Sequence, residues 1–240
     1  MTKKQYFMLL WAVSSIASII TVVTMLMKDE IPPIMPPIPL IVVVSAIGGI
    51  CIYGFFLSLG MDFANKIGLR FLLLDVNTDW YKDFLRPAIV IGTLYSCLLL
   101  VINVFTSPLF TFSVYHFLSW NIIFYKAMEN VFNVIAEDAF AILFVFSGVA
   151  LLIKKVVKNA SMFIIIPAAI ICIIMVPNVV EYIWRPGASV PFTFSVDKLN
   201  AVLLYMVAWL KGFETALLCH VFVTLILSLI VPAVVIALGI

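Results

Sequence analysis

Two adjacent carboxylates, Glu137 and Asp138, come directly before an apolar run from Ala139 to Ile153. Charged side chains inside an apolar segment of membrane length cost free energy, and they usually mark a functional site. Buried acids of this kind are compatible with catalysis and with the transport of ions or protons. The alternative is that the pair lies at the start of a helix near the membrane surface, where its charge favours the helix dipole.

A second polar feature lies about eighty residues further along the chain. His220 is set in the apolar run Thr215–Val223, and Thr224 follows four residues later, on the same face of a helix. A histidine in such surroundings needs a hydrogen-bond partner. The partner of a neutral buried histidine could be a backbone carbonyl or Thr224 alone. Glu214 lies near the start of the same run, where it favours the helix dipole.

The composition places these residues in a membrane. Of the 240 residues, 65% are hydrophobic and 11% are charged, which is far from a soluble globular composition. We therefore expect an all-α fold, a single integral membrane domain over residues 1–240. The formal net charge of +2 argues against a nucleic-acid partner and leaves the lipid bilayer as the main surrounding.

The apolar runs predict seven transmembrane helices, or eight if Pro232 divides the last one. The piece Ile67–Leu74 is too short to span and is expected to pack at the interface or as a re-entrant turn. The region 121–153 is expected to hold an interfacial helix and then a membrane helix. The expected helical segments are Tyr6–Met27, Ile38–Leu59, Pro87–Phe105, Asn121–Ile153, Ala160–Val180, Leu199–Leu210 and Gly212–Ile240.

The basic residues predict an orientation. With the N-terminus in the cytoplasm, the inner segments hold ten of the 14 lysines and arginines, and such an excess is typical of the cytoplasmic side. The ten are Lys3, Lys4, Lys66, Arg70, Lys82, Arg86, Lys154, Lys155, Lys158 and Lys211.

Two stretches match the motif pattern of a known family. In that pattern two glutamates begin a membrane helix and an arginine follows four residues after the second; here Glu137, Asp138 and Ile142 hold these positions. A later motif reads Gly-Leu-Glu, then His, then Asp or Asn four residues on; here it reads Gly212-Phe213-Glu214, His220 and Thr224. The chain thus resembles the CPBP family of intramembrane proteases, which includes the CAAX prenyl-protein endopeptidases, with a CPBP-like core over about residues 120–235.

The resemblance implies a catalytic arrangement. Glu137 would be the base that activates a water molecule, with Asp138 as a supporting acid. His220 would donate to the oxyanion, and the Thr224 hydroxyl would take the place of the family's amide. A middle motif with a second histidine falls on Ile171–Met175, so Met175 stands where the family has that histidine.

The same residues set limits on the chemistry. A zinc site needs three protein ligands. Only Glu137, Asp138 and His220 are candidates, and Met175 stands where the family has a second histidine, so we expect no metal, and we expect no other cofactor. Measured along their helices at about 1.5 Å per residue, Glu137 lies roughly 25 Å from Lys154 and His220 roughly 13 Å from Lys211. If both lysines mark the inner surface, the acid and the histidine differ in depth by about 10 Å.

Three functions fit the sequence. The first is a CPBP-type peptidase that cleaves a membrane-anchored or prenylated peptide through a glutamate-activated water. The second is a non-catalytic relative that binds a lipid, a peptide or a membrane protein partner, as the replacements at Ile142, Met175 and Thr224 suggest. The third is an ion or proton transporter, although the sequence shows no internal repeat of the kind that many transporters have.

Overall fold

The computed structural model describes residues 1–27, 38–75, 78–106, 120–157, 159–172 and 196–238. Within these ranges every regular element is helical, which confirms the expected fold class for the described part of the chain. Met175 and Lys158 lie outside the described residues, as does the last part of the expected helix Ala160–Val180.

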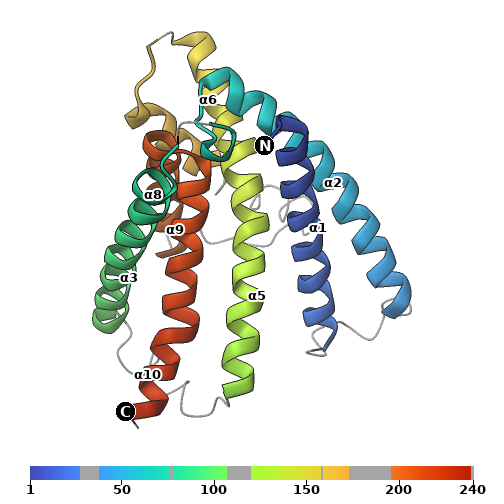
Figure 1. The fold of residues 1–240 in the computed structure, drawn as a ribbon, viewed down its shortest axis with the longest axis vertical. Coiled ribbons are helices and arrows are strands. Elements are labelled where there is room, and N and C mark those ends of the chain that lie inside the picture. The colour runs from blue at the N-terminus through green and yellow to red at the C-terminus, as the bar shows by residue number, and fades with distance from the viewer. Residues whose placement is uncertain (28–37, 76–77, 107–119, 158, 173–195, 239–240) are drawn as a thin grey trace, which may run out of the picture.

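The described residues form seven continuous helical stretches and one short turn (Figure 1). Three of the stretches contain a turn of π-helix, which adds one residue to the usual hydrogen-bonded ring. The stretches are α1 (Lys3–Met27); α2 (Ile38–Ile67); η2 (Trp80–Leu85) with α3 (Arg86–Thr106); α5 (Trp120–Asp138) with η4 (Ala139–Phe146) and α6 (Ser147–Val156); Met162–Cys172; α8 (Val196–Lys211); and α9 (Phe213–Leu225) with η5 (Ile226–Ile230) and α10 (Val231–Leu238); the short turn is η1 (Leu72–Leu74).

Three of these helices are long and apolar enough to cross a membrane: Trp80–Ile102, Lys126–Val156 and Phe213–Val234. The expected division of region 121–153 into two helices was wrong, because α5, η4 and α6 follow one another without a break. The last apolar run does not divide at Pro232 either. The π-helical turn η5 directly precedes α10 and loosens the hydrogen-bond pattern next to the proline, which has no N–H of its own.

The packing places α9 at the centre of one side of the bundle. This helix lies between α3 and α5 and also contacts α8, while α1 packs against α2 and α5 (Figure 1). Gly92 of α3 allows a close approach, because a Cβ there would lie 3.1 Å from the Cys219 carbonyl oxygen of α9. Small residues at a helix interface allow two helix backbones to approach this closely. The part of α9 around Cys219, next to His220, therefore packs directly against α3.

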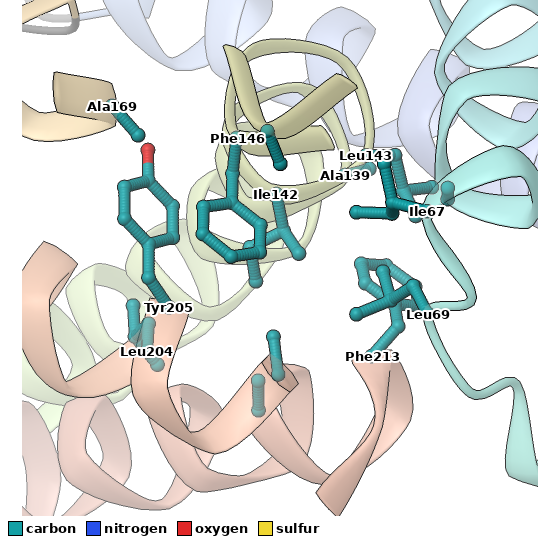
Figure 2. Packing of buried hydrophobic residues seen from close by; sticks show 14 of the residues in the cluster. Ile67, Leu69, Ala139, Ile142, Leu143, Phe146, Ala169, Leu204, Tyr205 and Phe213 are labelled. Carbon is teal, nitrogen blue, oxygen red and sulfur yellow. The ribbon is translucent and has the colours of Figure 1, made fainter. Parts of the chain in front are cut away.

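The core is built around η4. Its residues Ala139, Ile142, Leu143 and Phe146 are fully buried, and Figure 2 shows them between the end of α2, the start of α9 and the α8 residues Leu204 and Tyr205. The Phe146 and Tyr205 rings stack with their centroids 4.7 Å apart and their planes 18° apart. This packing fixes the π-helical turn directly after the acidic pair.

The short piece after α2 packs as expected for a segment that does not span. We call residues Leu69–Leu74 the connecting segment. The Glu214 carboxylate of α9 accepts hydrogen bonds from the backbone N–H groups of Leu72 at 3.0 Å and Leu73 at 3.3 Å. The N–H of Phe213 donates to the Arg70 carbonyl at 3.1 Å, and Gly212 has a φ of +111°, which side chains other than glycine's rarely allow. These contacts fix where α9 begins.

The next helix begins with a side-chain cap. The Asp79 carboxylate accepts hydrogen bonds from the backbone N–H groups of Tyr81 and Lys82 ahead of η2. These donors, above all the N–H of Lys82, lower the pKa of the exposed Asp79 carboxyl. The capping carboxylate is therefore charged, and it marks the start of the helix that continues into the apolar α3.

Candidate functional site

The Asp138 carboxylate and the His220 ring are in direct contact. His220 Nδ1 lies 3.0 Å from Asp138 Oδ1 and 3.1 Å from Oδ2, and the two residues are 82 positions apart in the sequence. The Asp138 side chain is 3% exposed and the His220 side chain 13%. A carboxylate beside Nδ1 requires the hydrogen on that nitrogen, so it sets the orientation and the tautomer of the ring.

The pairing follows from two antiparallel helices. Asp138 is the last residue of α5 and faces His220 on α9; eight residues earlier on α5, Asn130 Nδ2 donates to Ser228 Oγ at 3.0 Å, eight residues beyond His220. Both contacts therefore fit one register between the helices. The contacts of Glu214 with the connecting segment, six residues before His220, hold the other end of α9 in the same register.

A cavity of about 970 Å³ opens beside this pair. One wall is a continuous stripe of the α5–η4–α6 helix from Val134 to Lys155, which corresponds to about 30 Å of helix. Phe63 of α2, Ala201, Leu204 and Tyr205 of α8, and Cys172 complete the lining with His220. Most of the lining is aliphatic or aromatic, while the acids, Tyr205 and His220 form a polar patch. An apolar cavity with a few polar groups is the usual form of a ligand site.

Glu137 lines the same cavity but differs from its neighbour in exposure. It is exposed where Asp138 is buried, because consecutive residues on a helix point about 100° apart. Its carboxylate is close enough to Tyr53 and Tyr205 for electrostatic interaction. Of the two acids, Asp138 thus contacts the histidine and Glu137 faces the space where a ligand or a water could lie.

Three further residues were singled out in the sequence: Thr224, Met175 and Ile142. Thr224 is half-buried one turn beyond His220 on α9 and is not among the described residues that line the cavity. Met175 lies outside the described residues, three positions after Cys172, which does line the cavity. Ile142, at the position of the family's arginine, is fully buried in the core and is one of the residues around the cavity.

The structure decides against one alternative and one estimate from the sequence. The acidic pair does not begin a helix, as the alternative had it, because Glu137 and Asp138 lie inside one continuous helix and their backbone is followed directly by η4. The acids and His220 do not differ in depth by about 10 Å either, because Asp138 and His220 touch. The estimate counted only the rise of the helix backbone, whereas the Lys154 side chain reaches the Ile67 carbonyl at 3.1 Å and lies 4.6 Å from the centroid of the Trp209 ring.

The sequence grouped His220 with the acidic pair at one site but did not indicate that Asp138 is the acid in contact with the ring. A backbone carbonyl or Thr224 was the alternative partner for a neutral ring, whereas the described contact is with a carboxylate. Glu214 does lie in the first turn of α9, as expected, and its carboxylate holds the connecting segment.

Tyr205 and Cys172 were missed among the cavity residues. For Tyr205 a signal existed, because a tyrosine hydroxyl inside an apolar helix needs a polar partner. Among the described residues, no group of three or more His, Cys, Asp or Glu side chains is arranged to hold a metal ion.

The geometry supports acid–base chemistry on a ligand that is largely apolar. A carboxylate and a carboxylate-bound imidazole beside one cavity can take up, hold and return protons. Comparisons with protein-family models, with curated proteins and with solved structures found no match to this chain.

Proposed function

We propose that this protein is an intramembrane peptidase of the CPBP type, which cleaves a membrane-anchored or prenylated peptide with a water activated by Glu137. The observation that carries the proposal is the contact of His220 Nδ1 with the Asp138 carboxylate at 3.0 Å, beside a cavity that Glu137 also lines. The motif residues from two distant stretches thereby lie at one cavity, as a shared site requires.

The proposal includes a multi-pass position in the membrane with a cytoplasmic N-terminus. The three long apolar helices support it, as do the lipid-like side chains exposed on α3, where Leu94, Leu98 and Val101 are each more than half exposed. The N-terminus, the end of α2 and the start of α9 lie at the same end of the bundle (Figure 1). Lys3, Lys66 and Lys211 belong to that end, which suits the cytoplasmic side.

In the proposed reaction Glu137 transfers the proton, and His220 with Asp138 stabilises the oxyanion. Water adds its oxygen to the peptide carbonyl carbon while Glu137 takes one of its protons. His220, charged and held through Nδ1–H by Asp138, offers Nε2–H to the oxyanion that forms. The tetrahedral species then collapses, the C–N bond breaks, and the proton on Glu137 passes to the leaving amine. The products are a carboxylic acid and an amine.

The walls of the cavity support a substrate with a long apolar chain. The stripe from Val134 to Lys155 offers phenylalanine, leucine and valine side chains over about 30 Å. A prenyl group or a lipid anchor would displace poorly solvated water from these walls, while the peptide carbonyl would reach the polar patch. The peptide is thus presented to Glu137 by an anchor that never has to leave the membrane.

The test is cleavage of a farnesylated peptide by purified protein in liposomes. Glu137→Gln keeps the size of the side chain and removes the base, so the rate is expected to fall by about 100-fold or more. Asp62→Asn is the matched control, because it neutralises an exposed acid that pairs with Lys66 outside the cavity. Unchanged cleavage by the Glu137→Gln protein would remove the peptidase proposal.

A second candidate is a protein that binds such a ligand without cleaving it. The fully buried Ile142 at the position of the family's arginine favours this function, since no cation there balances the two acids. In that case the wild-type protein would bind the farnesylated peptide and leave it intact after long incubation. Cleavage that is lost in a His220→Gln variant would argue against this candidate.

A further inference from the structure

Tyr205 of α8 carries a polar group that the described structure leaves without a hydrogen bond. The residue is 1% exposed, and its hydroxyl oxygen has no hydrogen-bond partner among the described residues. A buried hydroxyl that lacks a partner costs stability, and such groups are few in native proteins. A hydroxyl of this kind beside a cavity is therefore a candidate for contact with a ligand.

The packing of the ring fixes where the hydroxyl points. The ring lies flat against Phe146 of η4, and Figure 2 shows its hydroxyl directed toward Ala169 of the helix Met162–Cys172. Cys172, three residues further along that helix, lines the cavity together with Tyr205. The hydroxyl is also within electrostatic range of Glu137 and Asp138. The phenol ring is thus held in the wall of the cavity with little rotational freedom.

The two carboxylates at the cavity explain why a ligand carbonyl would need the Tyr205 hydroxyl as a hydrogen-bond donor. Glu137 and Asp138 bring two carboxylates to the place where a peptide carbonyl would lie, and a carbonyl oxygen is repelled by such acceptors. A hydrogen-bond donor at the same cavity offsets this repulsion. The phenol O–H is such a donor, and Tyr205 is the tyrosine that lines the cavity in the described part of the chain.

We infer that the Tyr205 hydroxyl donates a hydrogen bond to the carbonyl oxygen of the ligand's reacting amide. The inference rests on the proposed function and gives it a second oxyanion donor beside His220. It also supplies, from α8, a polar group for a site whose second histidine is replaced by Met175 in the sequence. A donor fixed before the ligand arrives is the arrangement that stabilises an oxyanion most.

The test compares two uncleavable probes in two proteins. One probe is a farnesylated peptide with a –CO–CH₂– group in place of the reacting amide, and the other has –CH₂–CH₂– there. Wild-type protein is expected to bind the carbonyl probe about tenfold more tightly than the –CH₂–CH₂– probe, and Tyr205→Phe to show a clearly smaller preference, since only the His220 donor remains. An undiminished preference in the Tyr205→Phe protein, or no binding of either probe to wild type, would overturn the inference.

The controls separate the hydrogen bond from folding. Tyr205→Phe keeps the stack on Phe146 and removes a hydroxyl without a partner, so its Tm should equal or exceed that of wild type. Tyr6→Phe is the matched variant, because Tyr6 is also 1% exposed but lies at Glu214, outside the cavity lining. It should keep the wild-type preference for the carbonyl probe. If Tyr205→Phe does not fold, 3-fluorotyrosine at this position should raise the preference, since a more acidic phenol is a stronger donor.

Cleavage of the parent amide peptide distinguishes this inference from the proposed function. If wild type cleaves the peptide but the two probes show no dependence on Tyr205, the inference fails and the peptidase proposal stands. If wild type does not cleave but the dependence is present, the peptidase proposal fails and Tyr205 remains the donor of a binding site.

Discussion

Two buried carboxylates join α9 to other parts of the structure, and they differ in their hydrogen-bond partners. Glu214, at the start of α9, accepts two backbone N–H groups of the connecting segment. Asp138 contacts the His220 ring two turns further along α9, beside the cavity. Both carboxylates have hydrogen bonds, as buried charged groups must. Backbone donors cannot change protonation at ordinary pH, whereas an imidazole can.

The comparison shows that burial alone does not identify a functional acid. The Glu214 contacts join segments about 140 residues apart and fix the position of α9, which is a structural task. The Asp138 contact has a titratable partner and open space beside it, which is what proton transfer requires. The first contact also serves the second, because it sets the register in which His220 reaches Asp138.

The largest expected difference comes from the same change at both acids. In Asp138→Asn the amide oxygen can still accept the Nδ1–H of His220 but does not stabilise the charged ring, so cleavage should fall by about 100-fold or more with little change in Tm. In Glu214→Gln a single amide oxygen faces two backbone N–H groups, so the protein should lose about 1–3 kcal/mol of stability. Its cleavage rate per folded molecule should stay near that of wild type.

Rates measured in liposomes and melting curves in detergent check both variants. The assignment of a structural role to Glu214 and a chemical role to Asp138 would be contradicted if Glu214→Gln lost activity at full stability, or if Asp138→Asn kept activity. The first result would move the chemistry to the start of α9, and the second would show that the reaction does not need Asp138.

The next effect concerns the backbone at the start of α9. Gly212→Ala places a methyl group 3.0 Å from the Arg70 carbonyl oxygen at a φ of +111°, so a loss of about 1–3 kcal/mol in the free energy of unfolding is expected. Gly68→Ala is the matched control, because Gly68 also has a positive φ, +81°, but nothing lies within 4 Å of the added carbon. A larger loss of stability at Gly68 than at Gly212 would contradict the role of the close contact.

A smaller effect is expected at the end of α6. Lys154 donates to the Ile67 carbonyl and lies 4.6 Å from the centroid of the Trp209 ring, so Lys154→Gln should cost about 1 kcal/mol. The neighbouring Lys155→Gln changes an exposed side chain at the end of the cavity and should leave Tm unchanged. Equal melting temperatures for the two variants would show that the Lys154 contacts contribute nothing measurable.

The smallest effect is expected at Thr224. The sequence suggested its hydroxyl as a substitute for the family's amide, but the residue is not among the described residues that line the cavity. Thr224→Val should therefore leave the cleavage rate within about twofold of wild type, since no transition-state contact is removed. A tenfold loss of kcat with unchanged KM would restore Thr224 to the site.

Much of the fold could be predicted because it depends on local properties. Apolar runs of membrane length predict helices, and the short piece Ile67–Leu74 was correctly expected not to span. The polar residues that stand out in those runs, Glu137, Asp138 and His220, could be named for the same reason. Their hydrophobic surroundings are visible in the sequence itself.

Helix ends were harder to predict. The continuity of α5, η4 and α6 was missed, because acids inside a helix resemble acids at its start when only the sequence is known. The turn of π-helix after Asp138 has no clear sequence signal either. Its stability comes from core contacts such as the stack of Phe146 on Tyr205.

The sequence by itself determined that the chain is helical, that it is mostly apolar, and which few polar residues need an explanation. Only the tertiary structure decided that Asp138 is the acid in contact with His220, and that Glu137 and Tyr205 line the cavity beside this pair. The reason is that contacts between helices depend on their relative height and rotation. Those are set by distant contacts, such as Glu214 with Leu72, that no local pattern records.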